Sequence, residues 1–215
     1  MAQQSPLLPL YPSPDFEIGE ANGTRIALRK KKKKEWYDYV ADLSALRRRL
    51  FVGHAVPEWL TKHNISVPKD LLKYNSLEKG AVIVRLHRHQ YLLIDSVEGS
   101  AYDHVFSIEK RRHDDILVIG YEAAEIACGG PHIEDLIAEL CPMNVAISEP
   151  NSWIATRFAH CELAIRHLAE PPHYRILCSP ADARFVFKIL REVTLERDGV
   201  ALGFDDYRAL LNPGG

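Results

Sequence analysis

One short motif occurs twice in this chain, and its repetition constrains the fold more than any other feature. The two copies span residues 50–67 and 127–145, and Gly130 of the later copy lies 77 positions after Gly53 of the earlier one. Each copy has an apolar run, then glycine, then a proline placed to begin a helix. The chain is therefore expected to build two related units, each containing a strand, a glycine turn and a short helix.

The helical part of each copy carries its apolar residues on one face. Spacings of three, four and seven residues are typical of one buried stripe on an amphipathic helix. In the later copy the stripe is Ile133, Leu136, Ile137 and Leu140, and 77 positions earlier the same places hold Val56, Trp59, Leu60 and His63.

The remaining apolar runs extend each copy in the same order. Residues 81–86 and 91–94 predict a β-hairpin, followed by a helix that begins at Ser96 or Ser100. A strand region from residue 115 toward 127 leads into the second copy, and short strands are expected at 153–158, 161–165 and 174–178. Ser179, with proline next and a carboxylate three residues on, predicts the start of a last helix.

This order predicts an α+β protein made of two duplicated, ferredoxin-like β-α-β-β-α half-domains. Each would place its helices on one face of an antiparallel sheet. The expected boundaries are an irregular N-terminal arm at 1–23, a domain at 24–205 with halves 24–112 and 113–205, and a C-terminal tail at 206–215.

Composition limits the classes of function. The 215 residues are 47% apolar and 26% charged with a formal net charge of −2, so no global field favours nucleic acid or an anionic membrane. No window is apolar enough for a membrane span, and the N-terminus lacks a signal-peptide pattern. The four cysteines form no C-x-x-C pair. We expect buried, reduced thiols in a cytoplasmic protein and no metal site.

A run of six cations at residues 29–34 leaves three interpretations open. It is a solvated turn, or a docking patch for an acidic partner protein, or a site for a polyanion whose binding would weaken with salt. The residues assigned to partner docking are Lys31, Lys32, Lys33, Lys34 and the adjacent Trp36.

Several short phrases, in this order and spacing, resemble the aminomethyltransferase-type folate-binding fold. The resemblance is greatest to the small gamma subunit of heterotetrameric sarcosine oxidases and related N-methyl amino acid dehydrogenases, over residues 24–205. The phrases are Val40 to Ser44, Phe51 to Gly53, Trp59-Leu60, Ile65 to Pro68, Gly130-Pro131, Leu136, Leu140-Cys141, Ala155 to Arg157, Tyr174 to Ile176, and Ser179 to Ala183.

The chain departs from that pattern in three places. His54 follows Gly53 where the pattern has proline, and the phrase at Asp42 to Ser44 has no clean second copy near Tyr121. The length also leaves no room for the third, barrel-shaped domain of the catalytic aminomethyltransferases. The missing third domain favours an accessory subunit over a complete methyl-transferring enzyme.

The resemblance implies a non-catalytic small subunit that acts in assembly of a flavin-dependent sarcosine oxidase or N-methyl amino acid dehydrogenase. It would have no active site of its own and bind no cofactor, while FAD, FMN and tetrahydrofolate would sit on larger partner subunits. The alternative is a free-standing folate-binding or folate-dependent accessory protein of one-carbon metabolism.

The residues themselves agree that a flavin would belong to another chain, because neither G-x-G-x-x-G nor a P-loop is present. The most plausible ligand-facing group is Arg157, beside Thr156 and Trp153, since an arginine there could hold a carboxylate such as a folate glutamyl tail. An ion pair of Arg157 with Glu122, Glu125 or Glu162 is the alternative. The sequence His160-Cys161-Glu162 is expected to be structural, because neighbouring strand residues point to opposite faces.

Overall fold

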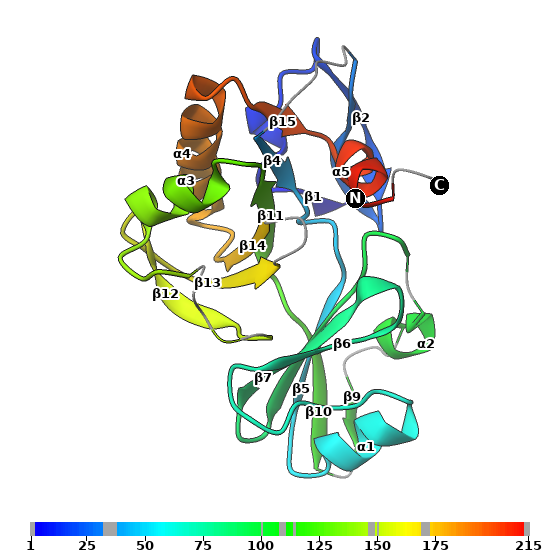
Figure 1. The fold of residues 1–215 in the computed structure, drawn as a ribbon. Coiled ribbons are helices and arrows are strands. Elements are labelled where there is room, and N and C mark those ends of the chain that lie inside the picture. Colours follow the sequence, from blue (N-terminus) through cyan, green and yellow to red (C-terminus); the bar gives the residue numbers. More distant parts are fainter. Residues whose placement is uncertain are drawn as a thin grey trace. The chain divides into compact units, whose positions relative to one another are not determined.

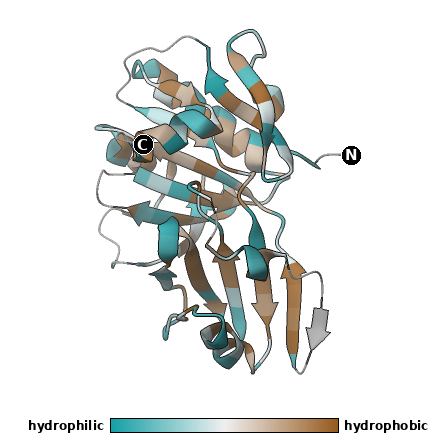
Figure 2. Ribbon diagram, turned by 90° about the vertical axis from the view of Figure 1, so that its right-hand side faces the viewer, coloured by the Kyte–Doolittle hydropathy of each residue, from teal (hydrophilic) through white to brown (hydrophobic). Residues whose placement is uncertain are grey.

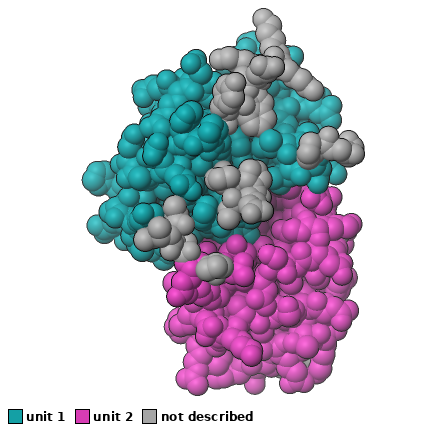
Figure 3. Space-filling model, viewed as in Figure 1, with its two compact units in different colours: residues 1–45, 123–148, 154–215 teal, residues 46–122, 149–153 magenta. Residues whose placement is uncertain are grey.

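The computed structural model describes residues 3–31, 38–99, 101–107, 111–113, 115–145, 149, 151–168 and 173–212. The chain divides into two compact units, shown in different colours in Figure 3. Unit 1 comprises residues 1–45, 123–148 and 154–215, and unit 2 comprises residues 46–122 and 149–153.

Unit 2 is built on a fully antiparallel six-stranded sheet with the order β6-β7-β8-β5-β10-β9 (Figure 1). Its core joins one face of this sheet to two short helices, and hydrophobic residues dominate the central strands (Figure 2). The elements are β5 (Arg48–Val52), α1 (Val56–Lys62), β6 (Tyr74–Ser76), the 3-10 helix η2 (Glu78–Gly80), β7 (Val82–His87), β8 (Gln90–Ile94), α2 (Asp103–Phe106), β9 (Arg111–His113) and β10 (Ile116–Gly120).

Unit 1 contains a second six-stranded sheet, with the order β12-β13-β14-β11-β4-β15. All neighbours are antiparallel except β15 and β4, which run parallel. The elements are β4 (Tyr39–Asp42), β11 (Ala124–Gly129), α3 (Ile133–Leu140), β12 (Ile154–Phe158), β13 (Cys161–Leu168), β14 (His173–Cys178), α4 (Ala183–Glu196), β15 (Val200–Leu202) and α5 (Phe204–Leu211).

The expected arm at 1–23 is more regular than its prolines suggest. It contains β1 (Gln3–Gln4), the 3-10 helix η1 (Leu8–Leu10) and all of β2 (Phe16–Ala21), and β3 (Thr24–Lys30) lies between β1 and β2 in a three-stranded sheet. Leu7 and Tyr11 are buried in the unit 1 core. The Tyr11 hydroxyl donates to the carbonyl of Leu202 and accepts from the N–H of Asp42, so it fastens the N-terminal segment to β15 and β4.

The two predicted helices form where expected. Ile133, Leu136 and Ile137 of α3 are buried, as are Val56 and Leu60 of α1. Gly53 and Gly130 directly follow β5 and β11, with φ of 144° and 124°. These are left-handed values that favour glycine over any residue with a Cβ.

A single strand region was expected from residue 115 toward residue 127, between the two halves. It divides into β10 and β11, which lie in different units. Strand β10 pairs with β5 of unit 2, and β4 pairs with β11 of unit 1. Each six-stranded sheet therefore takes one strand from the other expected half, and a boundary at residue 112 does not separate the two sheets.

Helix ends also differ locally from the expectations. Helix α2 begins at Asp103 after Tyr102, and Ser100 lies outside the described residues. Helix α4 begins after Asp182, while the Ser179 hydroxyl accepts the N–H of Ala181 in the preceding turn. The expected C-terminal tail is mostly α5, because Phe204 and Tyr207 give that segment a buried face.

Candidate functional site

A groove of about 590 Å³ opens in unit 1, where three elements meet. The C-terminal end of α3 forms one side, the turn between β12 and β13 another, and the first turns of α4 the third. Most of the lining is apolar, with four titratable side chains among it. The lining residues are Ala138, Glu139, Leu140, Cys141, Pro142, Arg157, Ala159, His160, Phe185 and Ile189.

The turn that forms one wall of the groove has a conformation unusual for its residues. Phe158 pairs with Cys161, so Ala159 and His160 make a two-residue hairpin turn with φ of 46° and 70°. Two left-handed residues are the pattern of a type I′ turn, which favours Asn-Gly over Ala-His. The N–H of Ala159 donates to the carbonyl of Leu140 at 2.9 Å. This bond to the end of α3 holds the turn in place.

Arg157 is the expected ligand-facing residue that lines this groove. Its side chain is 72% exposed, and its Nη2 lies 3.5 Å from Oε1 of Glu162, directly across the β12–β13 pair. Glu162 is thus the observed partner among the three carboxylates considered. An exposed pair at this distance contributes little to stability. The guanidinium therefore keeps the geometry needed to bind a carboxylate.

Thr156 and Trp153 are not among the residues that line this groove. The Thr156 hydroxyl is 3.6 Å from the sulfur of Cys141, on the opposite side of β12 from Arg157, as the strand alternation requires. Trp153 belongs to unit 2, is buried, and donates its backbone N–H to the carbonyl of Leu72 at 2.7 Å. Of the three expected pocket residues, Arg157 is the one that lines the groove.

The basic run is described only at its start. The Lys31 ammonium is exposed and donates to the carbonyl of Ser13 at 3.1 Å, and Arg29 lies 3.4 Å from Asp205 of α5. Lys32, Lys33, Lys34 and Trp36 lie outside the described residues.

A buried ion pair in the core of unit 1 was not anticipated. Arg175 on β14 donates from Nε and Nη2 to one oxygen of Glu125 on β11, at 2.8 and 2.6 Å. Burial opposes the charged guanidinium, but Glu125 and the nearby Tyr207 outweigh it and raise the pKa of Arg175. A sequence signal existed, because each residue is a charge within an otherwise apolar strand.

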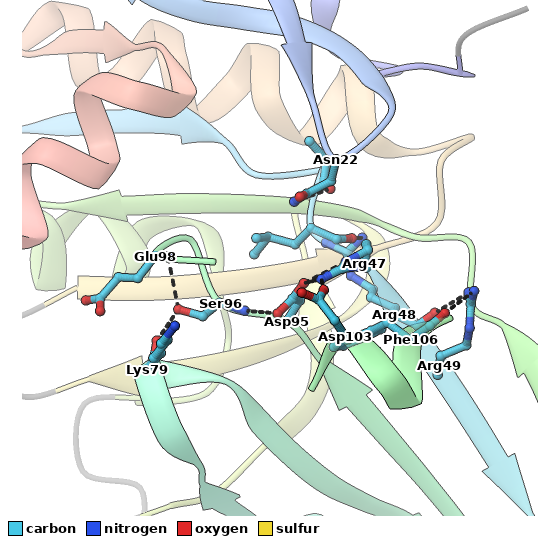
Figure 4. Close-up of polar contacts among 12 residues, drawn as sticks. Asn22, Arg47, Arg48, Arg49, Lys79, Asp95, Ser96, Glu98, Asp103 and Phe106 are labelled. Atoms are coloured by element: carbon cyan, nitrogen blue, oxygen red, sulfur yellow. Dashed lines mark hydrogen bonds and ion pairs between the residues drawn. The ribbon is translucent and has the colours of Figure 1, made fainter. Parts of the chain in front are cut away.

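Unit 2 holds its own polar cluster at the start of β5 (Figure 4). Arg47 donates to Asp95 and Asp103, at 2.8 and 2.5 Å, and its guanidinium lies 4.8 Å from the centre of the Phe106 ring. Arg49 donates to the carbonyl of Phe106 at 2.7 Å. These contacts fix the short helix α2 to the sheet, which gives the cluster a structural purpose.

The four cysteine thiols, all in unit 1, are the next candidates for reactive groups. Burial raises the pKa of the Cys161 thiol, which keeps it protonated, and the four cysteines are free. In the described part of the chain no three His, Cys, Asp or Glu side chains gather in a way that could hold a metal ion. No described helix is long and apolar enough to cross a membrane.

Comparison with known proteins identifies the fold. No protein-family model and no curated protein sequence matches the chain. Among solved structures, the glycine cleavage system aminomethyltransferase T from Bartonella henselae matches with a TM-score of 0.69 and 17% identity, over 96% of this chain. This chain covers only 61% of that protein.

The heterotetrameric sarcosine oxidase from Corynebacterium sp. U-96, solved in complex with pyrrole 2-carboxylate, also matches. The TM-score is 0.60 at 12% identity, over 88% of this chain and 93% of the matched chain. Both likenesses are at low identity and concern the fold alone. The chain has an aminomethyltransferase-like α+β fold.

Proposed function

We propose that this chain is the small, gamma-type subunit of a heteromeric flavin-dependent oxidase or dehydrogenase of N-methyl amino acids such as sarcosine. Its role is assembly of a cytoplasmic complex, and it contributes no catalytic residue. FAD, FMN and tetrahydrofolate are then bound by larger partner subunits. The two units descend from duplicated ferredoxin-like halves in this account, supported by the corresponding order of four strands in each sheet, β6-β7-β8-β5 and β12-β13-β14-β11, and by Gly53 and Gly130.

One observation carries the proposal. The match to a chain of the heterotetrameric sarcosine oxidase is nearly complete on both sides, at 88% and 93%. Because the match covers most of both chains, the two chains are similar in length and share one fold over most of that length.

The direct test is native isolation of this chain, affinity-tagged, from its own source. We expect larger flavin-containing subunits to elute with it in fixed stoichiometry, identified by mass spectrometry, and the complex to oxidise sarcosine or another N-methyl amino acid. A chain that elutes as a colourless monomer in such a preparation would contradict the proposal.

The alternative is a free-standing folate-binding accessory protein of one-carbon metabolism. It is favoured by the higher TM-score to the aminomethyltransferase and by the groove that Arg157 lines, where the guanidinium would hold a glutamyl carboxylate. Calorimetric titration of the isolated chain with tetrahydrofolate separates the two. Micromolar binding that is lost in Arg157→Met, and retained in an Arg184→Met control on exposed α4 surface, would favour the alternative.

A further inference from the structure

Two adjacent leucines in unit 2 are exposed to solvent just before β6. Leu71 is 53% exposed and Leu72 is 38% exposed. The other large apolar side chains with comparable exposure among the described residues belong to unit 1, and no two of them are adjacent. They are Met143, Phe185 and Leu195. Leu71 and Leu72, here called the Leu71–Leu72 knob, therefore form a distinct apolar point on unit 2.

The backbone at this knob is in a conformation that leucine disfavours. Leu72 has φ of 55°, in the left-handed region where a Cβ crowds the following carbonyl. Asparagine or glycine adopts that region at lower cost. Backbone strain of this kind persists only where the surrounding structure enforces it, and it is common at sites that present side chains to a ligand.

The surrounding structure does hold Leu72 from both sides. Its N–H donates to the carbonyl of Arg85 on β7 at 2.8 Å, and its carbonyl accepts the N–H of Trp153 at 2.7 Å. The Arg85 side chain also donates to the carbonyl of Lys69, at the start of the same turn. Trp153 is buried, so the residue that bonds to the Leu72 carbonyl is itself held in the core. The two leucines are therefore presented on a rigid support, which lowers the entropy cost of binding.

The charges around the knob indicate which kind of partner fits. Lys69, Asp70, Lys73, Arg85 and Glu149 carry three positive charges and two negative ones, and Lys73 bonds to Glu149 at 2.6 Å. A rim of mixed sign with one excess positive charge attracts a polyanion or an anionic membrane only weakly. An apolar centre within a polar rim is the composition of a protein–protein contact.

We infer that the Leu71–Leu72 knob anchors this chain to a larger subunit, by inserting into an apolar pocket of that subunit. The inference rests on the hetero-oligomer proposed above and specifies which surface makes the contact. Two leucines are far too small for a whole interface, so the knob acts as a hot spot within a larger one.

The test uses the native complex and the variant Leu72→Asn. Asparagine tolerates the left-handed backbone but lacks the apolar side chain, so folding and assembly should respond in opposite directions. The isolated variant should melt at the wild-type temperature or a few degrees above it. Its dissociation from the captured partner subunits, measured by biolayer interferometry, should be at least about tenfold faster, as for a truncated hot-spot residue.

Two further variants complete the design. Leu71→Ser makes no demand on the backbone and should also speed dissociation, which covers the case in which Leu72→Asn fails to fold. Leu195→Ser removes a leucine of similar exposure from α4 of unit 1 and should leave the dissociation rate unchanged.

Wild-type dissociation rates in Leu72→Asn and Leu71→Ser would overturn the inference and leave the proposed function standing. Failure of the wild-type chain to form any hetero-oligomer would overturn both. Sedimentation of the wild-type chain with phosphatidylcholine vesicles, lost in both variants, would identify a membrane contact and also overturn the inference.

Discussion

Glu125 and Arg175 form a buried ion pair in which two guanidinium nitrogens share a single carboxylate oxygen, at 2.8 and 2.6 Å. Strands β11 and β14 are neighbours in the unit 1 sheet, and the register places Ala127 opposite Arg175 and Glu125 opposite Leu177. The pair thus lies diagonally across the ladder. Arg175 also lies against the Tyr207 ring, 5.8 Å from its centre, which connects the sheet to α5.

Removing one partner of this pair should cost far more than removing both. Glu125→Gln leaves a buried guanidinium without its countercharge, and we expect unfolding by urea to show a loss of about 3–5 kcal/mol. The double variant Glu125→Leu/Arg175→Met should recover much of that loss. If Glu125→Gln lost less than about 1 kcal/mol, the pair would be exposed to solvent, contrary to its burial here.

Leu136 tests the packing of α3. It is fully buried in the stripe that faces the unit 1 sheet, so Leu136→Ala should lower the free energy of unfolding by about 2–5 kcal/mol. Glu134→Ala on the exposed side of the same helix is the matched control and should change it by less than about 0.5 kcal/mol. Equal effects of the two variants would mean that the helix does not pack as described.

The hairpin turn beside the groove should gain stability from ordinary turn residues. Replacing Ala159-His160 by Asn-Gly removes two disfavoured left-handed backbones, and we expect a gain of about 1 kcal/mol in thermal or urea unfolding. Val145→Ala is a useful contrast, since loss of a buried side chain should destabilise instead. A loss of stability in the Asn-Gly variant would show that the two native side chains contribute contacts that outweigh the strain.

The basic run is predicted to steer assembly. Changing Lys31 to Lys34 to glutamine should slow association with the partner subunits at low salt, because rim charges act mainly on the association rate. The melting temperature of the isolated chain should stay within a few degrees. An unchanged association rate would mean that the run is only a solvated turn. A large fall in the melting temperature of the isolated chain would mean that the lysines are paired within the fold.

The sequence predicted the elements that local physics determines. The glycine turns and the apolar stripes of α1 and α3 depend on residue spacing and on the φ preference of glycine. Both can be recognised in one copy of the repeated motif, and the second copy supports the prediction. The hairpin of β7 and β8 follows likewise from two apolar runs around a polar turn.

The pairing of strands that are distant in the sequence could not be predicted in the same way. No local feature of residues 39–42 or 116–120 says that each strand joins the sheet of the other half, since that depends on which partner edge is open. The burial of Trp153 within unit 2 likewise follows from where residues 149–153 attach. The proximity of Trp153, Thr156 and Arg157 in the sequence was therefore not evidence that they line the same pocket.

The proposed role as an accessory subunit is tested most directly by the visible absorption and activity of two preparations. One is the native complex, and the other is this chain produced alone and incubated with FAD and FMN. The account predicts flavin absorption and sarcosine oxidation in the complex, and neither in the isolated chain after desalting. An isolated chain that stays yellow and oxidises sarcosine would contradict the account.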